Sequence, residues 1–190
     1  YIWKKPIIPV NHLLGHIYAN WLTTSDQRPA TISFPALALL VSGGHTDLVL
    51  LKSHEKTLWI GGTLDDAAGE AFDKIGRLLN FPYPAGHAIE KASERGDVSR
   101  FTFPRPMIGS KDFNFSFSGL KTAVLREVSK FKKLNKQQIA DIALASQKSI
   151  IEVLVRKTVK AAKKYNARSI LLGGGVASNQ TLRDHLKLEI

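Results

Sequence analysis

The sequence has no cysteine, a single methionine and only 16 acidic residues in 190. Without cysteine, neither disulfide bonds nor thiolate metal sites can form, which fits a reducing compartment. No apolar run is long enough to span a membrane, and the opening segment Tyr1–Pro6 lacks the apolar stretch and the cleavage site of a signal peptide. We therefore expect no membrane partner. The missing initial Met and the end within a helical pattern predict a fragment of a longer protein.

Basic residues greatly outnumber acidic ones, and the net charge is +11. Almost all of this excess lies in the segment Lys121–Arg168, which holds 13 Lys and Arg against Glu127, Asp141 and Glu152, a net charge of +10. A segment of one charge sign attracts polyanions such as nucleic acid. A solvated helix face is the alternative interpretation.

Two short apolar runs, Ala36–Val41 and Leu48–Leu51, flank the turn Ser-Gly-Gly-His-Thr. Each run predicts a buried strand, and a third short strand is expected at Thr57–Ile60. Glycines leave the backbone N–H groups of the turn uncovered, and its serine and threonine add hydroxyl donors. Such a turn can cradle a phosphate or another oxyanion, whereas a plain hairpin turn is the alternative.

A helix is expected from Asn11, as its N-cap, to Leu22, and it carries His12 and His16 on one face. Two neutral imidazoles at this spacing can bind one divalent metal, with an Asp or a phosphate oxygen as the third ligand. A zinc peptidase of the H-E-x-x-H type needs Glu after the first His, where this chain has Leu13. Alternatively, the two histidines are ordinary helix residues that bind no metal.

A second helix is predicted to end near Leu79, with Asp65 or Asp66 as its cap. Asp66, Glu70 and Asp73 would place three carboxylates on one stripe of this helix. Like charges at that spacing repel, so we expect a cation or hydrogen-bond donor opposite them. A metal, a ribose, a substrate ammonium or neighbouring basic side chains could fill this role.

Further along, a short helix is expected over Ile89–Arg95, and the segment Phe101–Phe117 is expected to be irregular. The five phenylalanines of that segment predict either stacking with bases or packing beneath a long loop. Two helices follow, over 120–130 and 137–164, with Ser118 as the cap of the first.

A strand at Arg168–Leu172 leads into the glycines Gly173–Gly175, and a helix is expected from Gln180. Such a junction lets a ligand approach the backbone closely and places an anion at a helix N-terminus. Asn179 offers an amide for a hydroxyl or a ring nitrogen. Because neither G-x-G-x-x-G nor G-K-[ST] is present, the dinucleotide and Walker fingerprints are absent.

Two glycine turns on separate strands, joined by a β-β-β-α unit, suggest a nucleotide cleft of the actin and sugar-kinase type. Six motifs in a fixed order are more specific: VNHLLGHIYA, LLVSGGHT, DDAAGEAFDK, FPRP, FSFSGLKT and GGGVASNQTLR. In these motifs, which cover essentially the whole chain, the sequence resembles the tRNA threonylcarbamoyladenosine transferase family, formerly described as O-sialoglycoprotein endopeptidases. It is most similar to the bacterial and organellar branch.

The resemblance implies an α/β fold of the actin-like type, shared with sugar kinases and heat-shock ATPases, and incomplete in this chain. Residues 1–30 would be the end of the N-terminal lobe with the metal-binding helix, and residues 31–190 the incomplete C-terminal lobe with a helical insertion. A cytoplasmic protein is implied, or a mitochondrial one in the organellar branch. We expect this piece alone to be inactive, because most of the N-terminal lobe and a downstream Asp metal ligand are missing.

The family's activity is a metal-assisted acyl transfer. The resemblance implies that a threonylcarbamoyl group passes from L-threonylcarbamoyladenylate to the exocyclic amine of the adenosine next to the tRNA anticodon, giving AMP. A divalent metal, iron or zinc, would be held by His12 and His16, and the adenylate would bind as ATP does in related folds. The implied protein partners are a non-catalytic paralogue and a small ATPase. The implied substrate-binding residues are Leu40, Val41, Ser42, Gly43 and Gly44 for the phosphate and carbamoyl region, and Asp73, Gly86, Glu90 and Asn179 for the nucleoside part.

We further expect the basic segment Lys121–Arg168 to help hold tRNA. Three alternatives stay open: a metalloendopeptidase, a sugar-kinase-like ATP phosphotransferase, and a non-catalytic scaffold of the same fold. The missing Glu after His12 counts against the first, and the lack of a catalytic Asp near a phosphate loop counts against the second. The retained pair of histidines counts against the third.

Overall fold

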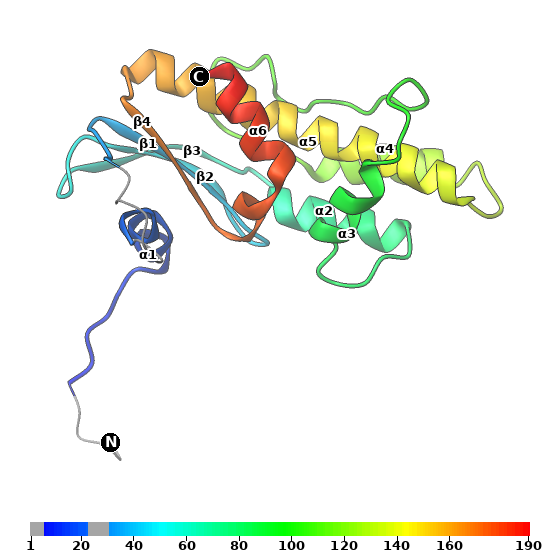
Figure 1. Ribbon diagram of the computed structural model, residues 1–190, viewed down its shortest axis with the longest axis horizontal. Helices are drawn as coiled ribbons and strands as arrows, with labels where there is room; N and C mark the ends of the chain where they lie inside the picture. The colour runs from blue at the N-terminus through cyan, green and yellow to red at the C-terminus, as the bar shows by residue number, and fades with distance from the viewer. Residues whose placement is uncertain (1–5, 23–30) are drawn as a thin grey trace.

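The computed structural model describes residues 6–22 and 31–190. Figure 1 shows a four-stranded sheet on one side of the molecule and a group of helices on the other. The expected lobe boundary at residue 30 lies outside the described residues. The elements in chain order are α1 (His12–Tyr18), the 3-10 helix η1 (Ala19–Trp21), β1 (Ala36–Val41), β2 (Thr46–Leu51), β3 (Thr57–Gly62), α2 (Ala68–Leu78), α3 (Gly86–Ser93), α4 (Ser118–Val128), α5 (Lys136–Tyr165), β4 (Ser169–Gly173), the 3-10 helix η2 (Gly175–Ser178) and α6 (Gln180–Glu189).

The sheet has the strand order β3-β2-β1-β4. The predicted antiparallel run of three strands is confirmed, with β2 starting two residues earlier and β3 ending two residues later than expected. β4 pairs in parallel with β1, in a register that places Leu40 opposite Gly173. Because parallel strands run in the same direction, both glycine turns leave the sheet at the same edge.

β1 is one of the two inner strands, and its alternating side chains enter two different cores. Leu37, Leu39 and Val41 join the larger cluster, which α2, α5 and α6 complete. Ala38 and Leu40 join a smaller cluster with Ile17 of α1. Figure 1 shows the same layering, with α5 over one face of the sheet and α1 below the other. Burial of each leucine stabilises this arrangement by about 1.5–3 kcal/mol.

The long helix α5 has clear sequence signals at both ends. Asn135 and Gln138 form a reciprocal capping box at its start, and Asn166 ends it in the left-handed conformation with φ of 51°. Its apolar stripe is interrupted by Lys157, whose side chain is 1% exposed. The Lys157 ammonium donates to Ser110 Oγ at 2.7 Å. Burial lowers the pKa of Lys157, because the charged group has lost most of its water.

Lys157 lies beneath the segment Phe101–Phe117, which is irregular, as predicted, and contains no helix or strand. Phe103, Phe113, Phe115 and Phe117 are buried there, at 4% exposure or less. The prediction that these aromatics stack with bases is therefore wrong for those four, and packing beneath a long loop is confirmed.

Among residues 6–22 and 31–190, no helix combines the length and apolarity that crossing a membrane requires.

Three predicted helix starts differ from the structure. Neither Asp65 nor Asp66 caps α2; the first helical N–H, that of Ala68, donates instead to Thr46 Oγ1 of β2 at 2.8 Å. Ser118 is the first residue of α4 rather than its cap, and its hydroxyl donates to the Asp65 carboxylate at 2.7 Å. α3 begins at Gly86, three residues before the expected start.

The predicted N-cap Asn11 is confirmed, because its side chain accepts from the N–H groups of Leu13 and Leu14. The helix itself ends earlier than expected: α1 stops at Tyr18 and continues as the tighter η1 to Trp21. Tyr18 and Trp21 then pack against the ring of His54 in the β2–β3 hairpin. These contacts hold the histidine-bearing helix against the sheet.

Candidate functional site

The two glycine turns meet at the carboxyl ends of β1 and β4. Gly174 has φ of 92°, and a Cβ atom there would collide with the carbonyl of Val41. Gly69, in the first turn of α2, donates its N–H to the Ser42 carbonyl at 3.1 Å, and a side chain at Gly69 would strike Ser42 and Gly43. Glycine is therefore required at these two positions for the backbone segments to approach one another.

A cavity of about 530 Å³ opens between these turns, α2 and α3. Five of the nine predicted substrate-binding residues line it: Gly43, Asp73, Gly86, Glu90 and Asn179. They come from the β1–β2 turn, α2, α3 and the start of α6, which the fold brings together from across the sequence. Their binding roles stay predictions, but their convergence on one cavity is a property of the fold.

The other four predicted residues do not line this cavity. The side chains of Leu40 and Val41 are 1% and 0% exposed and enter the two cores on opposite faces of the sheet. Ser42 closes its own turn, because its N–H donates to the His45 carbonyl at 2.8 Å and its hydroxyl accepts from the His45 N–H at 3.1 Å. Gly44 is exposed. At these positions only the backbone and the Ser42 hydroxyl can serve a ligand.

Two carboxylates give the cavity its polarity. Asp73 Oδ1 accepts from the N–H of Ala85 at 2.7 Å, and Glu90 Oε1 accepts from the N–H of Gln180 at 2.6 Å. Each carboxylate is held by the backbone and keeps further acceptor capacity. Phe72 and Tyr83 add aromatic surface to the same wall. A cavity with fixed acceptors and aromatic walls suits a ligand with hydroxyl groups and a flat ring.

The three carboxylates of the predicted stripe, Asp66, Glu70 and Asp73, have different surroundings in the structure. Lys74 pairs with Asp66 at 2.6 Å and with Glu70 at 2.9 Å, while Asp73 faces the cavity. Hydrogen bonds to Asp66 and then to Glu70 raise the pKa of Lys74. The prediction that a basic neighbour faces the stripe is confirmed for two of its three members.

A buried polar network lies behind the cavity and was not predicted from the sequence. Gln147 of α5 is 2% exposed, and its Oε1 accepts from the Asn179 amide at 3.0 Å. Its Nε2 donates to Ser93 Oγ at 2.8 Å and lies 3.3 Å from Thr181 Oγ1. Asn179 Oδ1 in turn caps α6 by accepting from the Leu182 N–H. The sequence offers only a weak signal for Gln147, a polar residue on the apolar side of α5, which does not by itself indicate a role.

The histidine pair lies beside the same strand ends. The Nε2 atoms of His12 and His16 are 3.2 Å apart. A tetrahedral metal with nitrogen ligands at 2.0–2.1 Å holds two such nitrogens roughly 3.3 Å apart, so the pair fits two coordination positions. Within the described parts of the chain, no group of three or more His, Cys, Asp or Glu side chains could hold a metal. The spacing of the pair is compatible with two ligands of one metal ion, and metal binding by His12 and His16 stays a prediction.

His16 also borders a second, smaller cavity. This cavity has a volume of about 250 Å³ and is lined by Gly173, Gly174, Ser178 and Arg183 besides His16. Ser178 lines the larger cavity as well, so the two spaces are neighbours. His16 thus borders open space next to a glycine turn, and His12 is exposed, so neither histidine is enclosed in packed hydrocarbon.

Comparison with known proteins gives one consistent result. A family model described as tRNA N6-adenosine threonylcarbamoyltransferase matches residues 1–189. The chain is similar to a protein of that name from Thermosipho africanus, with 51% identity over 94% of this chain and 52% of the relative. A protein of that name from Thermomicrobium roseum is 46% identical over 98% of this chain and 57% of the relative. Another from Syntrophomonas wolfei is 48% identical over 98% of this chain and 54% of the relative. The chain spans about half the length of these curated relatives.

Proposed function

Since this chain belongs to the tRNA N6-adenosine threonylcarbamoyltransferase family, we propose that its full-length protein transfers a threonylcarbamoyl group from L-threonylcarbamoyladenylate to the exocyclic amine of an adenosine next to the tRNA anticodon. The observation that supports this most is the convergence of Gly43, Asp73, Gly86, Glu90 and Asn179 on one cavity beside a histidine pair. The family model and the relatives confirm the family named from the sequence, and the activity is the proposal.

The fold class predicted from the sequence, α/β of the actin-like type and incomplete, is also confirmed. A mixed sheet between α1 and α5, with glycine turns at one edge, fits part of one lobe of that fold. We keep the assignment of residues 1–30 to the N-terminal lobe as part of the proposal. A cytoplasmic location, or a mitochondrial one in the organellar branch, belongs to the proposal as well.

In this proposal the larger cavity holds the nucleoside part of the adenylate. The carboxylates of Asp73 and Glu90 accept hydrogen bonds from ribose hydroxyls, since each is fixed by a backbone N–H and still has free lone pairs. The aromatic ring of Phe72 borders the space for the base. Asn179 has one amide hydrogen left for a ligand after its bond to Gln147.

Transfer needs no protein nucleophile, because the carbamoyl carbon is already activated as a mixed anhydride with phosphate. The adenosine amine attacks that carbon, the bond from the carbon to the phosphate oxygen breaks, AMP leaves, and the amine loses a proton to solvent. The backbone N–H groups of Gly43 and Gly44 would stabilise negative charge on oxygen, since that of Ser42 already donates to the His45 carbonyl. His12 and His16 would hold a divalent ion, iron or zinc, which supplies Lewis-acid polarisation of a carbonyl.

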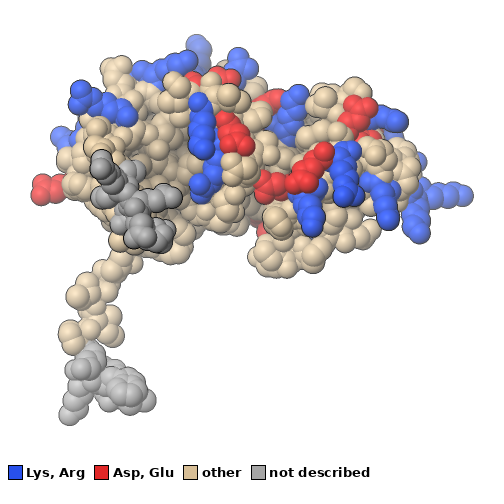
Figure 2. All heavy atoms as spheres, viewed as in Figure 1, with Lys and Arg blue, Asp and Glu red and all other residues tan. Residues whose placement is uncertain are grey.

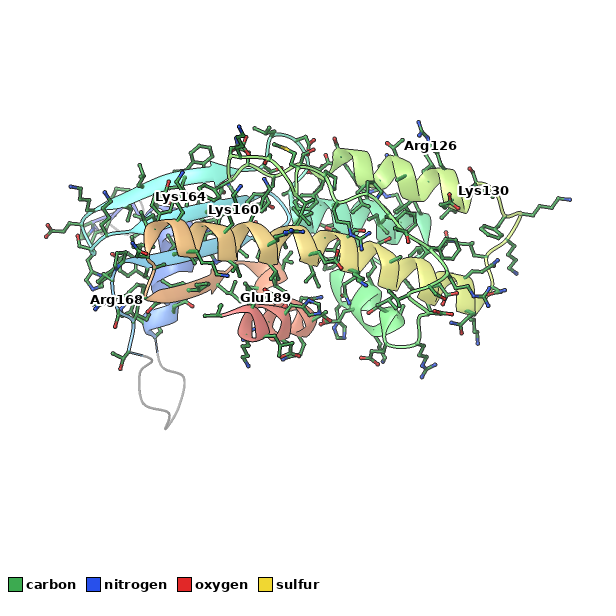
Figure 3. The ribbon with its side chains drawn as sticks, turned by 90° about the horizontal axis from the view of Figure 1, so that it is seen from above. Arg126, Lys130, Lys160, Lys164, Arg168 and Glu189 are labelled. Atoms are coloured by element: carbon green, nitrogen blue, oxygen red, sulfur yellow. The ribbon has the colours of Figure 1, made fainter. Side chains whose placement is uncertain are left out.

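The basic segment Lys121–Arg168 is the proposed contact with tRNA. Figure 2 shows Lys and Arg side chains over α5 and at the far end of the helical region. In Figure 3, Lys160, Lys164 and Arg168 lie at the carboxyl-terminal end of α5, whereas Arg126 and Lys130 lie on α4. No acidic residue occurs between Val153 and Arg183 in the sequence. Glu152 and Glu189 line the same hollow as Arg156, Lys160 and Lys163, but basic side chains outnumber them there. Such an excess of positive charge suits a phosphate backbone.

Two companion proteins complete the proposal: a non-catalytic paralogue and a small ATPase. The metalloendopeptidase and scaffold alternatives receive no support, because the matched relatives are named as transferases. Leu13 also stands where a zinc peptidase of the H-E-x-x-H type needs its general base.

The test is a transfer assay with the full-length protein, labelled threonylcarbamoyladenylate and tRNA. We expect label on the tRNA and release of AMP, and no label on a tRNA in which inosine replaces the target adenosine, since inosine lacks the exocyclic amine. The His12→Ala and His16→Ala variants should transfer at least tenfold more slowly. Undiminished transfer by both variants would remove the metal role, and no transfer by the wild type would refute the function.

A further inference from the structure

The smaller cavity beside His16 differs from the nucleoside cavity in its charge. We propose that it is the subsite for the threonyl part of the substrate and that Arg183 binds the threonyl carboxylate there. This inference rests on the proposed function, which supplies a substrate with an adenosine at one end and a carboxylate at the other. None of the roles implied by the family resemblance involves Arg183.

Charge separates the two cavities. The larger one is lined by the carboxylates of Asp73 and Glu90, and no Lys or Arg is among its described lining residues. An anion placed there would meet two like charges. The smaller one is lined by Arg183 and His16, and its described lining residues include no carboxylate. The anionic end of a ligand that spans both cavities therefore belongs in the smaller one.

The arrangement of the cavities matches the order of groups in the substrate. Ser178 borders both spaces, and the glycines Gly43 and Gly174 line the larger and the smaller one, respectively. With the adenosine in the larger cavity, the phosphate lies at this junction and the threonyl group continues into the smaller cavity. A volume of about 250 Å³ corresponds to roughly eight water molecules at 30 Å³ each, which is room for one small amino-acid moiety.

The Arg183 side chain is held in place by the turn that forms the cavity wall. Its Nε donates to the carbonyl of Ala177 in η2 at 2.7 Å. In the described parts of the chain, no other hydrogen bond and no ion pair engages its guanidinium, and the neighbouring Asp184 accepts from Gln180 instead. The terminal N–H groups are thus available in a fixed orientation. A planar guanidinium with two such groups is suited to bidentate recognition of a carboxylate.

The position next to His16 gives this contact a consequence for the reaction. A carboxylate held by Arg183 and a nucleoside held at Asp73 and Glu90 fix both ends of the substrate. The carbamoyl group between them is then confined to the region of the glycine turns and the histidine pair. Arg183 would also select acyl groups that carry a carboxylate over carbamoyl groups that lack one.

The test uses the full-length protein with Arg183→Met and Arg183→Lys, and Arg100→Met as the matched control. Arg100 lies in an exposed turn and pairs only loosely with Asp97, at 3.9 Å. Binding of threonylcarbamoyladenylate without tRNA and binding of AMP are measured by titration. We expect Arg183→Met to weaken threonylcarbamoyladenylate binding roughly 10- to 100-fold, the range for a lost charge-assisted hydrogen bond, and to leave AMP binding unchanged. The affinity of Arg183→Lys for threonylcarbamoyladenylate should lie between those of the wild type and Arg183→Met. Arg100→Met should bind both ligands as the wild type does.

Each other outcome has a definite meaning. Equal weakening of threonylcarbamoyladenylate and AMP in Arg183→Met would overturn the carboxylate assignment, because AMP has a phosphate but no carboxylate. Unchanged binding of both would show that Arg183 does not contact the substrate. Unchanged AMP affinity also reports that the variant is folded around its nucleoside cavity. If the wild type labels tRNA but Arg183→Met binds threonylcarbamoyladenylate with wild-type affinity, only this inference is refuted. If the wild type labels no tRNA, the proposed function is refuted and this inference with it.

Discussion

The side-chain carbonyl of Gln147 accepts a hydrogen bond from the amide of Asn179 at 3.0 Å, across the interface between α5 and the start of α6. Both residues are buried, at 2% and 6% exposure. Gln147 thereby fixes the amide orientation of a residue that lines the larger cavity. Because the same glutamine donates to Ser93 of α3, one side chain ties three helices around the proposed nucleoside site.

Replacement of Gln147 by leucine should therefore loosen this site. We expect Gln147→Leu to destabilise the full-length protein by about 1–3 kcal/mol, since the partners of a buried amide are left unsatisfied. We also expect AMP to bind about tenfold more weakly. The matched control is Gln137→Leu on the same helix, which loses bonds to Asp141 and to the Arg95 carbonyl away from the cavity. If AMP affinity falls equally in both variants, Gln147 has only a structural role.

The histidine pair should bind metal in the intact protein. We expect His12→Ala and His16→Ala each to lower metal content at least tenfold, because either change removes one of the two converging Nε2 atoms. Metal content is measured by elemental analysis of purified full-length protein. His185→Ala on α6 is the matched control and should retain the wild-type content. Wild-type metal content in both site variants would contradict a metal centre on α1.

Asp65 should make stability depend on pH. Burial opposes its ionisation, but hydrogen bonds from Ser116, Ser118 and the N–H of Phe117 outweigh this effect and lower the pKa of Asp65. A lowered pKa in the folded state means that this contribution to stability is present above the unfolded pKa of about 3.9 and is lost as pH falls through the folded value.

We therefore expect Asp65→Asn to lower the free energy of unfolding by about 1 kcal/mol at pH 7. The difference from the wild type should shrink below about pH 4, where the wild-type carboxylate also becomes protonated. Urea denaturation of the full-length protein at a series of pH values measures both quantities. Glu55→Gln, in an exposed hairpin, serves as control and should follow the wild type. A difference that stays constant down to pH 2 would rule out the ionised carboxylate as its source.

The basic segment should contribute to tRNA affinity. Reversing the charges of Lys132, Lys133 and Lys136 should weaken tRNA binding and reduce the dependence of log K on log salt by roughly 0.7–0.9 for each lost phosphate contact. Filter binding at several salt concentrations measures both the tRNA affinity and its salt dependence. A double reversal of Lys52 and Lys56, in the β2–β3 hairpin, is the control for net charge. Unchanged affinity and slope in the triple variant would reject the tRNA contact.

Signals confined to one stretch of sequence predicted most of the fold. The apolar run Ala36–Val41 gave its strand within the correct bounds, and Asn11 was correctly predicted as an N-cap. The cap of α2 was predicted wrongly, because the acceptor for the Ala68 N–H is Thr46, on a strand that precedes the helix by many residues. A nearby aspartate is the favoured cap only when no such tertiary partner exists.

In the candidate site, too, residues with a local sequence signal were predicted, and residues defined by tertiary partners were not. The glycine turns and Asn179 stood out locally, since glycine runs after strands are rare and have a known use. Gln147 and Arg183 did not stand out, because a glutamine in a helix and an arginine after an asparagine cap are ordinary until their partners are known. Those partners, Ser93 and Ala177, belong to other elements, so only the folded structure shows what these side chains do.

The parallel pairing of β1 with β4 sets the order in which the protein can be completed during its synthesis. β1, β2 and β3 can form their antiparallel ladder as soon as they leave the ribosome, whereas β4 is translated more than a hundred residues later, on the order of ten seconds at about 5–20 residues per second. Until then the apolar edge of β1 has no neighbour, and both cavities lack one wall. A nascent chain of this protein therefore passes through an interval in which an apolar strand edge is exposed and the proposed nucleoside site is incomplete.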